Sequence, residues 1–288
     1  MSTARQPSTA TPAQTRVREE VLAWGGPRPQ VPPGLLAAAR QELRAAVVEQ
    51  HPEAGPRSLH LATALRGRGA DGAPFDHDRA TVRGILLARA FARDVERGHG
   101  DDLPALVAAV ADELAGERPG DPASASAWLN AADPSALADL RRELVDVLVD
   151  VRELWPPLDR DHLDIAVRPS LRVEVAPGPV VVTVRPDLVL DSPRRDERAR
   201  SLVVVARTGM PRPREDRDRV RATALVTALA TDRVPFRWVT LHLTDGRAEV
   251  EDLEAQVLLD TARALGQRIA AVLGEGRQDT TGRGGGQR

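Results

Sequence analysis

The amino-acid sequence predicts a mixed α/β fold, in which helices flank a central mixed sheet and a helical region precedes the sheet. Through the first half of the chain, apolar residues recur every three or four positions, as they do along one face of a helix. After Trp155-Pro156-Pro157 the pattern changes to short runs of β-branched residues, which favour strands. The runs are LRVEV, PVVVTV, DLVLD, SLVVVA and FRWVTLHL.

Local signals place several helices in the first half. One helix is expected to begin after Pro33, a second to run from Arg79 to Glu96 and a third from Leu103 to Leu114. The clearest helix opens at Asp133-Pro134, an N-cap residue followed by proline at the first helical position. In the second half, we expect a crossover helix from Arg217 to Ala230 and a closing helix from Val250 to Leu273.

Composition along the chain divides it into four parts. Residues 1–32 are rich in Pro, Ser, Thr and Ala without periodicity and predict a disordered tail. Residues 33–165 form the helical region, and residues 166–274 form the α/β core. Residues 275–288 are glycine-rich and polar and predict a second disordered tail.

Composition also excludes some classes of function. The chain has no cysteine, which excludes disulfides and thiolate metal sites, and all 40 basic residues are arginine. These are balanced by 42 acidic residues, so any basic surface must be local. No segment approaches the roughly 18 apolar residues of a membrane span, and the N-terminus has no apolar signal region, so we expect a cytoplasmic protein without a membrane partner.

The stretch from Leu171 to Gly246 carries the functional signal. A strand with Glu174 is followed by a strand pair containing Arg185-Pro186-Asp187, then by a strand ending in Arg207-Thr208-Gly209, and then by a helix. This order resembles the RecB-like branch of the PD-(D/E)XK nuclease superfamily, whose core contains a "GxxDxV" strand, a "vvDyKTG" strand and a helix with "QxxxY". The resemblance implies a restriction-endonuclease-like core in which two acidic residues hold Mg²⁺ and a lysine assists the attacking water.

Carried over residue by residue, the motif is only partly kept. Asp187 occupies the position of the first metal-binding aspartate, whereas Val205 stands at the second carboxylate and Arg207 at the lysine. Arg219 and Thr223 stand at the Gln and Tyr of the helix motif. The resemblance therefore makes Asp187 and Arg207 the candidate catalytic residues of a degenerate site.

The candidate metal ligands are Asp187 and Glu174. Because Mg²⁺ normally uses one or two carboxylates with substrate phosphate, Asp187 alone predicts a weak site, and we expect no other cofactor. Glu174 helps only if it faces the same edge, and the alternation of LRVEV favours a solvated position instead. Asp187 has an alternative interpretation as an ordinary turn or edge aspartate. Arg207 stays protonated and cannot replace a lysine as a proton carrier, although it can grip phosphate.

An arginine series around the same strand end is the candidate nucleic-acid-binding surface. Its members are Arg207, Arg212, Arg214, Arg217, Arg219 and Arg221. A groove lined by them would contact phosphate groups. However, Glu215, Asp216 and Asp218 interrupt the series, so the alternative is a solvated helix start laced by ion pairs.

The leading hypothesis is a non-catalytic PD-(D/E)XK-like pseudoenzyme that acts by binding DNA or a protein partner. One alternative is an active Mg²⁺-dependent DNA nuclease with relocated catalytic residues, such as Glu215 or Asp218. A third possibility is a structural or protein-interaction module whose N-terminal helices present the working surface. Convergence of Asp187, Glu174 and Arg207 on one concave edge would favour the nuclease-like hypotheses, and failure to converge would weaken both of them together.

Overall fold

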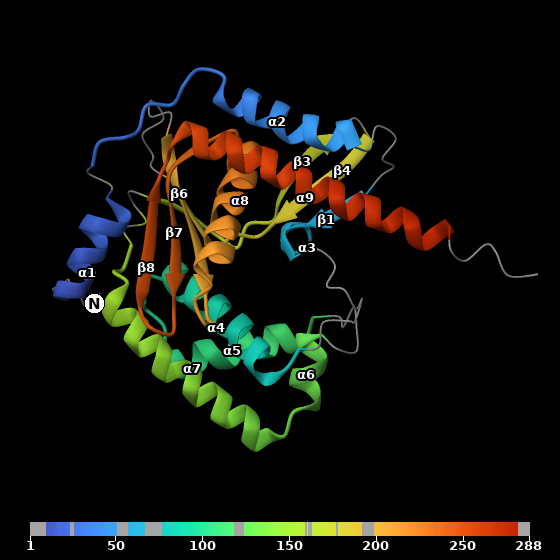
Figure 1. Ribbon diagram of the computed structural model, residues 1–288. Coiled ribbons are helices and arrows are strands. Elements are labelled where there is room, and N and C mark those ends of the chain that lie inside the picture. The colour runs from blue at the N-terminus through green and yellow to red at the C-terminus, as the bar shows by residue number, and fades with distance from the viewer. Residues whose placement is uncertain are drawn as a thin grey trace, which may run out of the picture.

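The computed structural model confirms a mixed α/β fold with two mixed sheets flanked by helices (Figure 1). It describes residues 10–23, 26–50, 57–66, 77–117, 124–158, 160, 163–176, 178–191 and 199–281. Most of the expected charged loop SPRRDERAR lies outside these ranges.

The helices of the first half follow the predicted pattern. Helix α7 begins where the predicted N-cap places it, because the side chain of Asp133 accepts the N–H of Ser135. Helix α4 has the predicted bounds, and the side chain of Asp78, which was not singled out from the sequence, caps it by accepting the N–H of Thr81. The described helices of this half are α1 (Pro12–Arg16), η1 (Val17–Leu22), α2 (Leu35–Gln50), α3 (Leu61–Arg66), α4 (Arg79–Glu96), α5 (Leu103–Ala115), α6 (Ala125–Ala131) and α7 (Pro134–Leu154).

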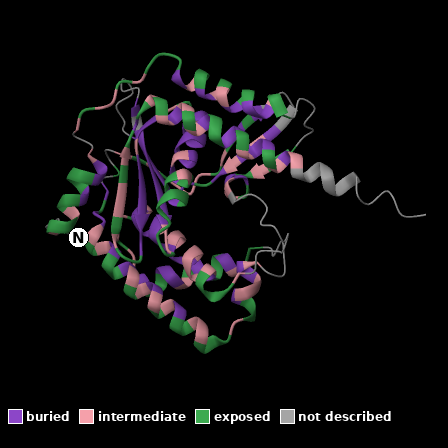
Figure 2. Ribbon diagram, in the orientation of Figure 1, coloured by how far each residue is buried: buried purple, intermediate pink, exposed green. Residues whose placement is uncertain are grey.

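The larger sheet has five strands, in the order β2-β5-β6-β7-β8. Its strands are β2 (Asp164–Val167), β5 (Leu188–Asp191), β6 (Ala199–Arg207), β7 (Val234–His242) and β8 (Arg247–Asp252). The central strand β6 runs antiparallel to β5 and parallel to β7, and α8 (Pro213–Thr231) makes the crossover and packs on both β6 and β7. Leu202 to Val205 are buried, as predicted for an interior strand, and Figure 2 shows the same for β6 and β7.

A smaller sheet has three strands, in the order β1-β4-β3. It consists of β1 (Arg57–His60), β3 (Leu171–Ala176) and β4 (Gly178–Val184). The expected single central sheet is therefore divided, and the chain leaves one sheet at Val184 and enters the other at Leu188. Pro186 lies in this connection, where its missing N–H prevents a continuous ladder of hydrogen bonds.

Four parts of the described structure differ from the sequence-based expectations. Residues 12–22 were expected in a disordered tail but form α1 and η1, whose Val17, Val21 and Leu22 are buried in the core. The residues expected to open the closing helix instead form β8, because RAEVED alternates in exposure along a strand. The closing helix α9 spans Ala255–Thr281 and so extends into the expected C-terminal tail. The four-residue strands β1 and β2 were not predicted.

The helices lie at two ends of the sheets (Figure 1). Helices α2 and α9 lie side by side at one end, and α4, α5, α6 and α7 gather at the other. Gly266 permits the close approach of α9 to α2, because a Cβ there would lie 2.7 Å from the Cβ of Ala46 and 2.8 Å from the carbonyl oxygen of Leu43. Residues of the expected helical region thus contact the expected core, as β1 also does by pairing with β4.

A buried ion cluster joins α4 to α7. Asp94 is 1% exposed and accepts hydrogen bonds from Nε of Arg152 at 3.0 Å. The Nδ1 atom of His99 lies 2.6 Å from the same carboxylate oxygen, and Arg152 also donates to the carbonyl oxygen of Asp101. Burial acts to raise the pKa of Asp94, but hydrogen bonds from His99 and Arg152 outweigh burial and lower it.

We predict that Asp94→Ala lowers the free energy of unfolding by about 3–5 kcal/mol at neutral pH, because it leaves the Arg152 cation buried without its partner. Since the pKa of Asp94 is lowered in the folded state, this contribution is present above about pH 4 and is lost as the pH falls further. Urea denaturation at neutral and acidic pH measures both effects.

The control is Asp139→Ala, which breaks an ion pair whose two side chains are 63% and 70% exposed. Its effect should stay below about 1 kcal/mol. An equally small effect of Asp94→Ala would show that the buried cluster does not stabilise the fold.

Candidate functional site

Asp187 is held in place by three hydrogen bonds at the point where the chain enters the larger sheet. Its backbone N–H donates to the carbonyl oxygen of Val204 at 3.1 Å, and its carbonyl oxygen accepts the N–H of Arg168 at 3.0 Å. Its carboxylate Oδ2 accepts the N–H of Ala206 at 2.8 Å. The side chain is therefore anchored to the end of β6.

The strand register brings together three of the positions named by the sequence. Leu188 pairs with Val204 where the pairing of β5 with β6 ends, and the backbone N–H of Asp187 donates to the carbonyl oxygen of the same Val204. Asp187 therefore lies beside Val204 at this strand end, and its carboxylate reaches the N–H of Ala206. Val205 and Arg207 follow on β6 and share a face of the strand. The valine at 205 offers no oxygen that could share a cation with Asp187.

Cationic side chains dominate the surroundings of Asp187. Burial of the carboxyl group raises the pKa of Asp187, while the N–H of Ala206 and the charges of Arg168, Arg219 and Arg207 act in the opposite direction. These three arginines come from the segment after β2, from α8 and from the end of β6. The charges that act on this carboxyl group are therefore all positive, although burial has the larger effect on its pKa.

The residues around Asp187 do not fit a Mg²⁺ site. One of its carboxylate oxygens already accepts the Ala206 N–H, and Val204 and Val205 on the adjoining part of β6 have no oxygen in their side chains to offer a metal ion. Within the described residues, no group of three or more His, Asp and Glu side chains is placed to hold a metal ion. Glu174 lies on the smaller sheet, where it pairs with Val181 and is exposed, as the alternation of LRVEV favoured.

Arg207 is engaged by a carboxylate that the sequence did not single out. Its Nε lies 2.7 Å from Oδ1 of Asp216, and the two side chains are 23% and 1% exposed. Asp216 also accepts the backbone N–H of Arg212 at 2.8 Å, in the first turn of α8, where a negative charge is favoured by the helix dipole. From the sequence, Asp216 was expected to lie in solvent and to interrupt the arginine series. A run of charged residues gives no sign that one of them is buried.

The remaining arginines of the series divide into paired and unpaired members. Arg212 pairs with Glu215 at the surface at 3.1 Å, and Arg221 pairs with Glu251, which also accepts the indole N–H of Trp238.

Arg214 and Arg217 are exposed at the start of α8 and have no ion-pair partner within 4.0 Å among the described residues. Arg219 is exposed as well, and its charge acts on Asp187. The series is therefore not one continuous row of free cations.

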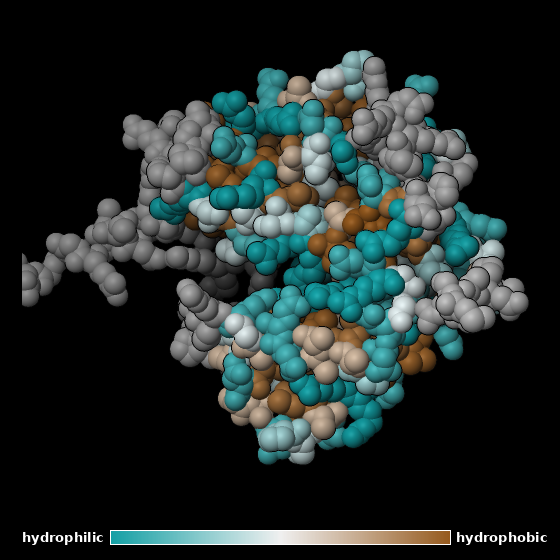
Figure 3. Space-filling model, turned by 180° about the vertical axis from the view of Figure 1, so that it is seen from behind, coloured by the Kyte–Doolittle hydropathy of each residue, from teal (hydrophilic) through white to brown (hydrophobic). Residues whose placement is uncertain are grey.

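The surface offers little large apolar area to a partner. Hydrophilic side chains cover much of the face seen in Figure 3, and the apolar patches between them are small. The exposed large hydrophobic residues within the described ranges are Val149, Met210 and Val250. None of the described helices is both long and apolar enough to span a bilayer.

Comparison with known proteins does not assign a family. No protein-family model matches the chain, and no curated protein matches it. Among solved structures it is similar to the one titled "Crystal structure of SSO0001", at 11% sequence identity over 80% of this chain and 83% of that chain, with a TM-score of 0.26. A TM-score this low carries no fold assignment, so function is inferred from the topology and the geometry around Asp187.

We predict that ionisation of Asp187 lowers stability. Because its folded-state pKa is raised above the usual 3.8, the protonated form contributes stability that is present at acidic pH and lost as the pH rises through the raised pKa. Asp187→Asn keeps an oxygen for the Ala206 N–H but cannot ionise. The unfolding free energy of wild type minus that of Asp187→Asn should therefore fall as the pH rises from about 4 towards neutrality.

Urea denaturation of both proteins across this pH range gives the difference. A difference that grows with pH would instead mean that the arginines stabilise the carboxylate more than burial destabilises it. Asp139→Asn, at an exposed position, serves as the control for a general effect of pH on the fold.

Proposed function

We propose that this chain is a PD-(D/E)XK-like protein with a restriction-endonuclease-like core that binds nucleic acid without cutting it. Support for the core comes from the strand order around β6: an antiparallel neighbour β5, which Asp187 directly precedes, and a parallel neighbour β7 reached through α8. The observation that carries the proposal of a non-cutting protein is Val205, which stands at the second carboxylate of the motif and offers no oxygen to a metal ion.

Two further features argue against hydrolysis. Arg207 stands at the position of the assisting lysine but stays protonated, so it cannot move a proton, and Asp216 already holds it in a largely buried ion pair. The chain has no lysine elsewhere to replace it, since all 40 basic residues are arginine. The same guanidinium groups are well suited to bind phosphate oxygens, so loss of the metal chemistry does not remove affinity for a polyanion.

A relocated active site receives less support from the acidic residues of α8. Glu215 pairs with Arg212, and Asp218 pairs with Arg268 at 2.7 Å. Asp216 is buried against Arg207. These carboxylates neutralise neighbouring arginines, which reduces their ability to bind Mg²⁺.

Nucleic acid is favoured as the partner by the first turns of α8. Arg214 and Arg217 extend into solvent from this end of the helix and have no ion-pair partner among the described residues. They follow directly after the end of β6, where Arg207 and Asp187 lie. Exposed arginines of this kind gain affinity by displacing counterions from phosphates, without reading the base sequence.

We predict that the purified protein does not cleave single- or double-stranded DNA with Mg²⁺ or Mn²⁺, because one carboxylate without a lysine cannot assemble the catalytic metal site. Gel assays with end-labelled DNA measure cleavage. Asp187→Ala, purified in parallel, reports any contaminating nuclease. Cleavage by wild type that disappears in Asp187→Ala would establish an active nuclease and overturn the proposal.

We predict that the double variant Arg214→Ala/Arg217→Ala binds duplex DNA more weakly on all sequences alike. Two lost phosphate contacts should reduce the slope of log affinity against log salt by about 1.8 for a duplex, or about 1.4 for a single strand. Fluorescence anisotropy at several salt concentrations measures the slope.

The matched control is Arg212→Ala, which removes an arginine of the same segment that is already paired with Glu215. In Arg212→Ala, the slope of log affinity against log salt should change by less than half as much as it does in Arg214→Ala/Arg217→Ala. Weak wild-type binding with the same slope in all three proteins would favour the protein-interaction module instead.

A further inference from the structure

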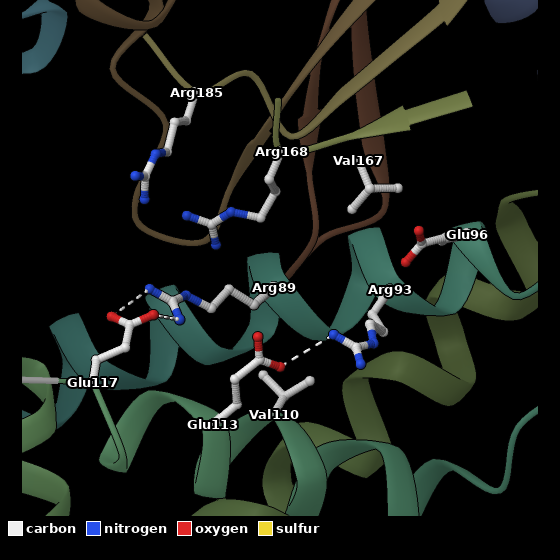
Figure 4. A pocket seen from close by; sticks show the side chains of 9 residues that line it. All are labelled: Arg89, Arg93, Glu96, Val110, Glu113, Glu117, Val167, Arg168 and Arg185. Atoms are coloured by element: carbon white, nitrogen blue, oxygen red, sulfur yellow. Dashed lines mark hydrogen bonds and ion pairs between the residues drawn. The ribbon is translucent and has the colours of Figure 1, made fainter. Parts of the chain in front are cut away.

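A small cavity lies between the helical layer and the edge of the larger sheet. It encloses about 270 Å³ and is lined by residues of α4 and α5, by the end of β2 and by the connection between β4 and β5. Figure 4 shows the guanidinium groups of Arg89, Arg168 and Arg185 turned towards the same part of this cavity. These residues are far apart in the sequence, and only the fold brings them together.

The charges that line the cavity are not balanced. Four arginines and three glutamates line it. Arg89 uses both terminal nitrogens to bind Glu117, at 2.6 and 3.2 Å, and Arg93 binds Glu113 at 3.1 Å. In contrast, Arg168 and Arg185 form no ion pair within 4.0 Å among the described residues.

Arg168 is half-buried beside the cavity, whereas Arg185 is exposed. Desolvation lowers the pKa of Arg168, and the like charges of Arg89 and Arg185 add to this effect, while Asp187 and Glu117 oppose it. A partly desolvated cation without an ion-pair partner costs free energy, so an anion that enters the cavity would stabilise Arg168.

The backbone holds Arg168 in an unusual conformation. Its φ of 44° lies in the left-handed region, which non-glycine residues seldom adopt. The N–H of Arg168 donates to the carbonyl oxygen of Asp187, which fixes the residue in this conformation beside the cavity. Strained backbone of this kind is found preferentially at ligand-binding positions.

We propose that this cavity binds the phosphate group of a phosphate monoester. A phosphate dianion offers three terminal oxygens, which can accept hydrogen bonds from the guanidinium groups of Arg168 and Arg185, and the planar guanidinium fork matches this geometry. The volume is just below the range of roughly 300–1,000 Å³ for drug-sized ligands, which suits one phosphate group with little else enclosed. The monoester belongs either to a small phosphate compound or to the end of a nucleic-acid strand.

The first test measures the effect of inorganic phosphate on the melting temperature, compared with chloride at equal ionic strength. Phosphate should raise the melting temperature of wild type, and Arg168→Asn/Arg185→Gln should weaken phosphate binding by about 100-fold, at roughly tenfold for each hydrogen bond lost to a charged group. Asparagine is chosen at 168 because it tolerates the left-handed conformation. Arg142→Gln, which removes an exposed arginine outside the cavity, should bind phosphate as wild type does.

A second variant keeps the proposal testable if the double variant does not fold. Glu117→Gln removes a negative charge and releases Arg89, so it should tighten phosphate binding by about tenfold or less. A merely structural ion pair would give no such gain. Absence of phosphate binding to wild type, or unchanged binding in Glu117→Gln and Arg185→Gln, would overturn the proposal.

Two oligonucleotides of the same sequence, with and without a 5′-phosphate, separate the two sources of the monoester. Tighter binding of the phosphorylated strand, lost in Arg185→Gln, assigns the cavity to strand ends, whereas equal binding assigns it to small phosphate compounds. This inference does not rest on the proposed function, because the salt slope depends on Arg214 and Arg217 outside the cavity. If phosphate binding to the cavity is not found, the salt slope of DNA binding still tests the proposed function, and the reverse also holds.

Discussion

The hydrogen bond from the backbone N–H of Ala206 to the carboxylate of Asp187 is the contact on which the functional region depends. It anchors the short connection between the two sheets to the end of the central strand β6, just where β4 has ended and β5 begins. Because the carbonyl oxygen of Asp187 also accepts the N–H of Arg168, the same residue fixes the edge of the cavity. Asp187 thus links the end of β6 to the segment that holds Arg168 at the edge of the cavity.

Arginines supply most of the charge around this strand end. Two carboxylates lie here: Asp187 accepts the N–H of Ala206, and Asp216 forms an ion pair with Arg207. The charges that act on Asp187 are those of three arginines, Arg168, Arg219 and Arg207. In the cavity beside it, Arg168 and Arg185 have no ion-pair partner among the described residues, and the proposed phosphate site rests on these two side chains.

The sequence predicted those features that depend on local pattern. An apolar stripe located α4, a capping residue located α7, and dense β-branched runs located β6 and β7, because these signals act within a few residues. Four-residue strands such as β1 and β2 have too few positions to show the two-residue alternation of a strand.

The division into two sheets depends on the path of the chain at Pro186, and η1 is stabilised by packing against distant elements. In the candidate site, Asp187, Val205 and Arg207 could be identified from the sequence because they could be compared with a motif. The cavity arginines could not be predicted, because their proximity arises from tertiary contacts between distant segments.

The most direct measurement of the central claim is calorimetric titration of Mg²⁺ and Mn²⁺ into wild type, Asp187→Ala and Val205→Glu. If Asp187 alone cannot hold a metal ion, wild type should bind no more metal than Asp187→Ala does. A carboxylate introduced by Val205→Glu, at the second acidic position of the motif, should create binding that is lost again when Asp187→Ala is added. Stoichiometric binding of either ion to wild type that disappears in Asp187→Ala would contradict the account, because it would mean that the arginine surroundings of Asp187 still admit a catalytic metal.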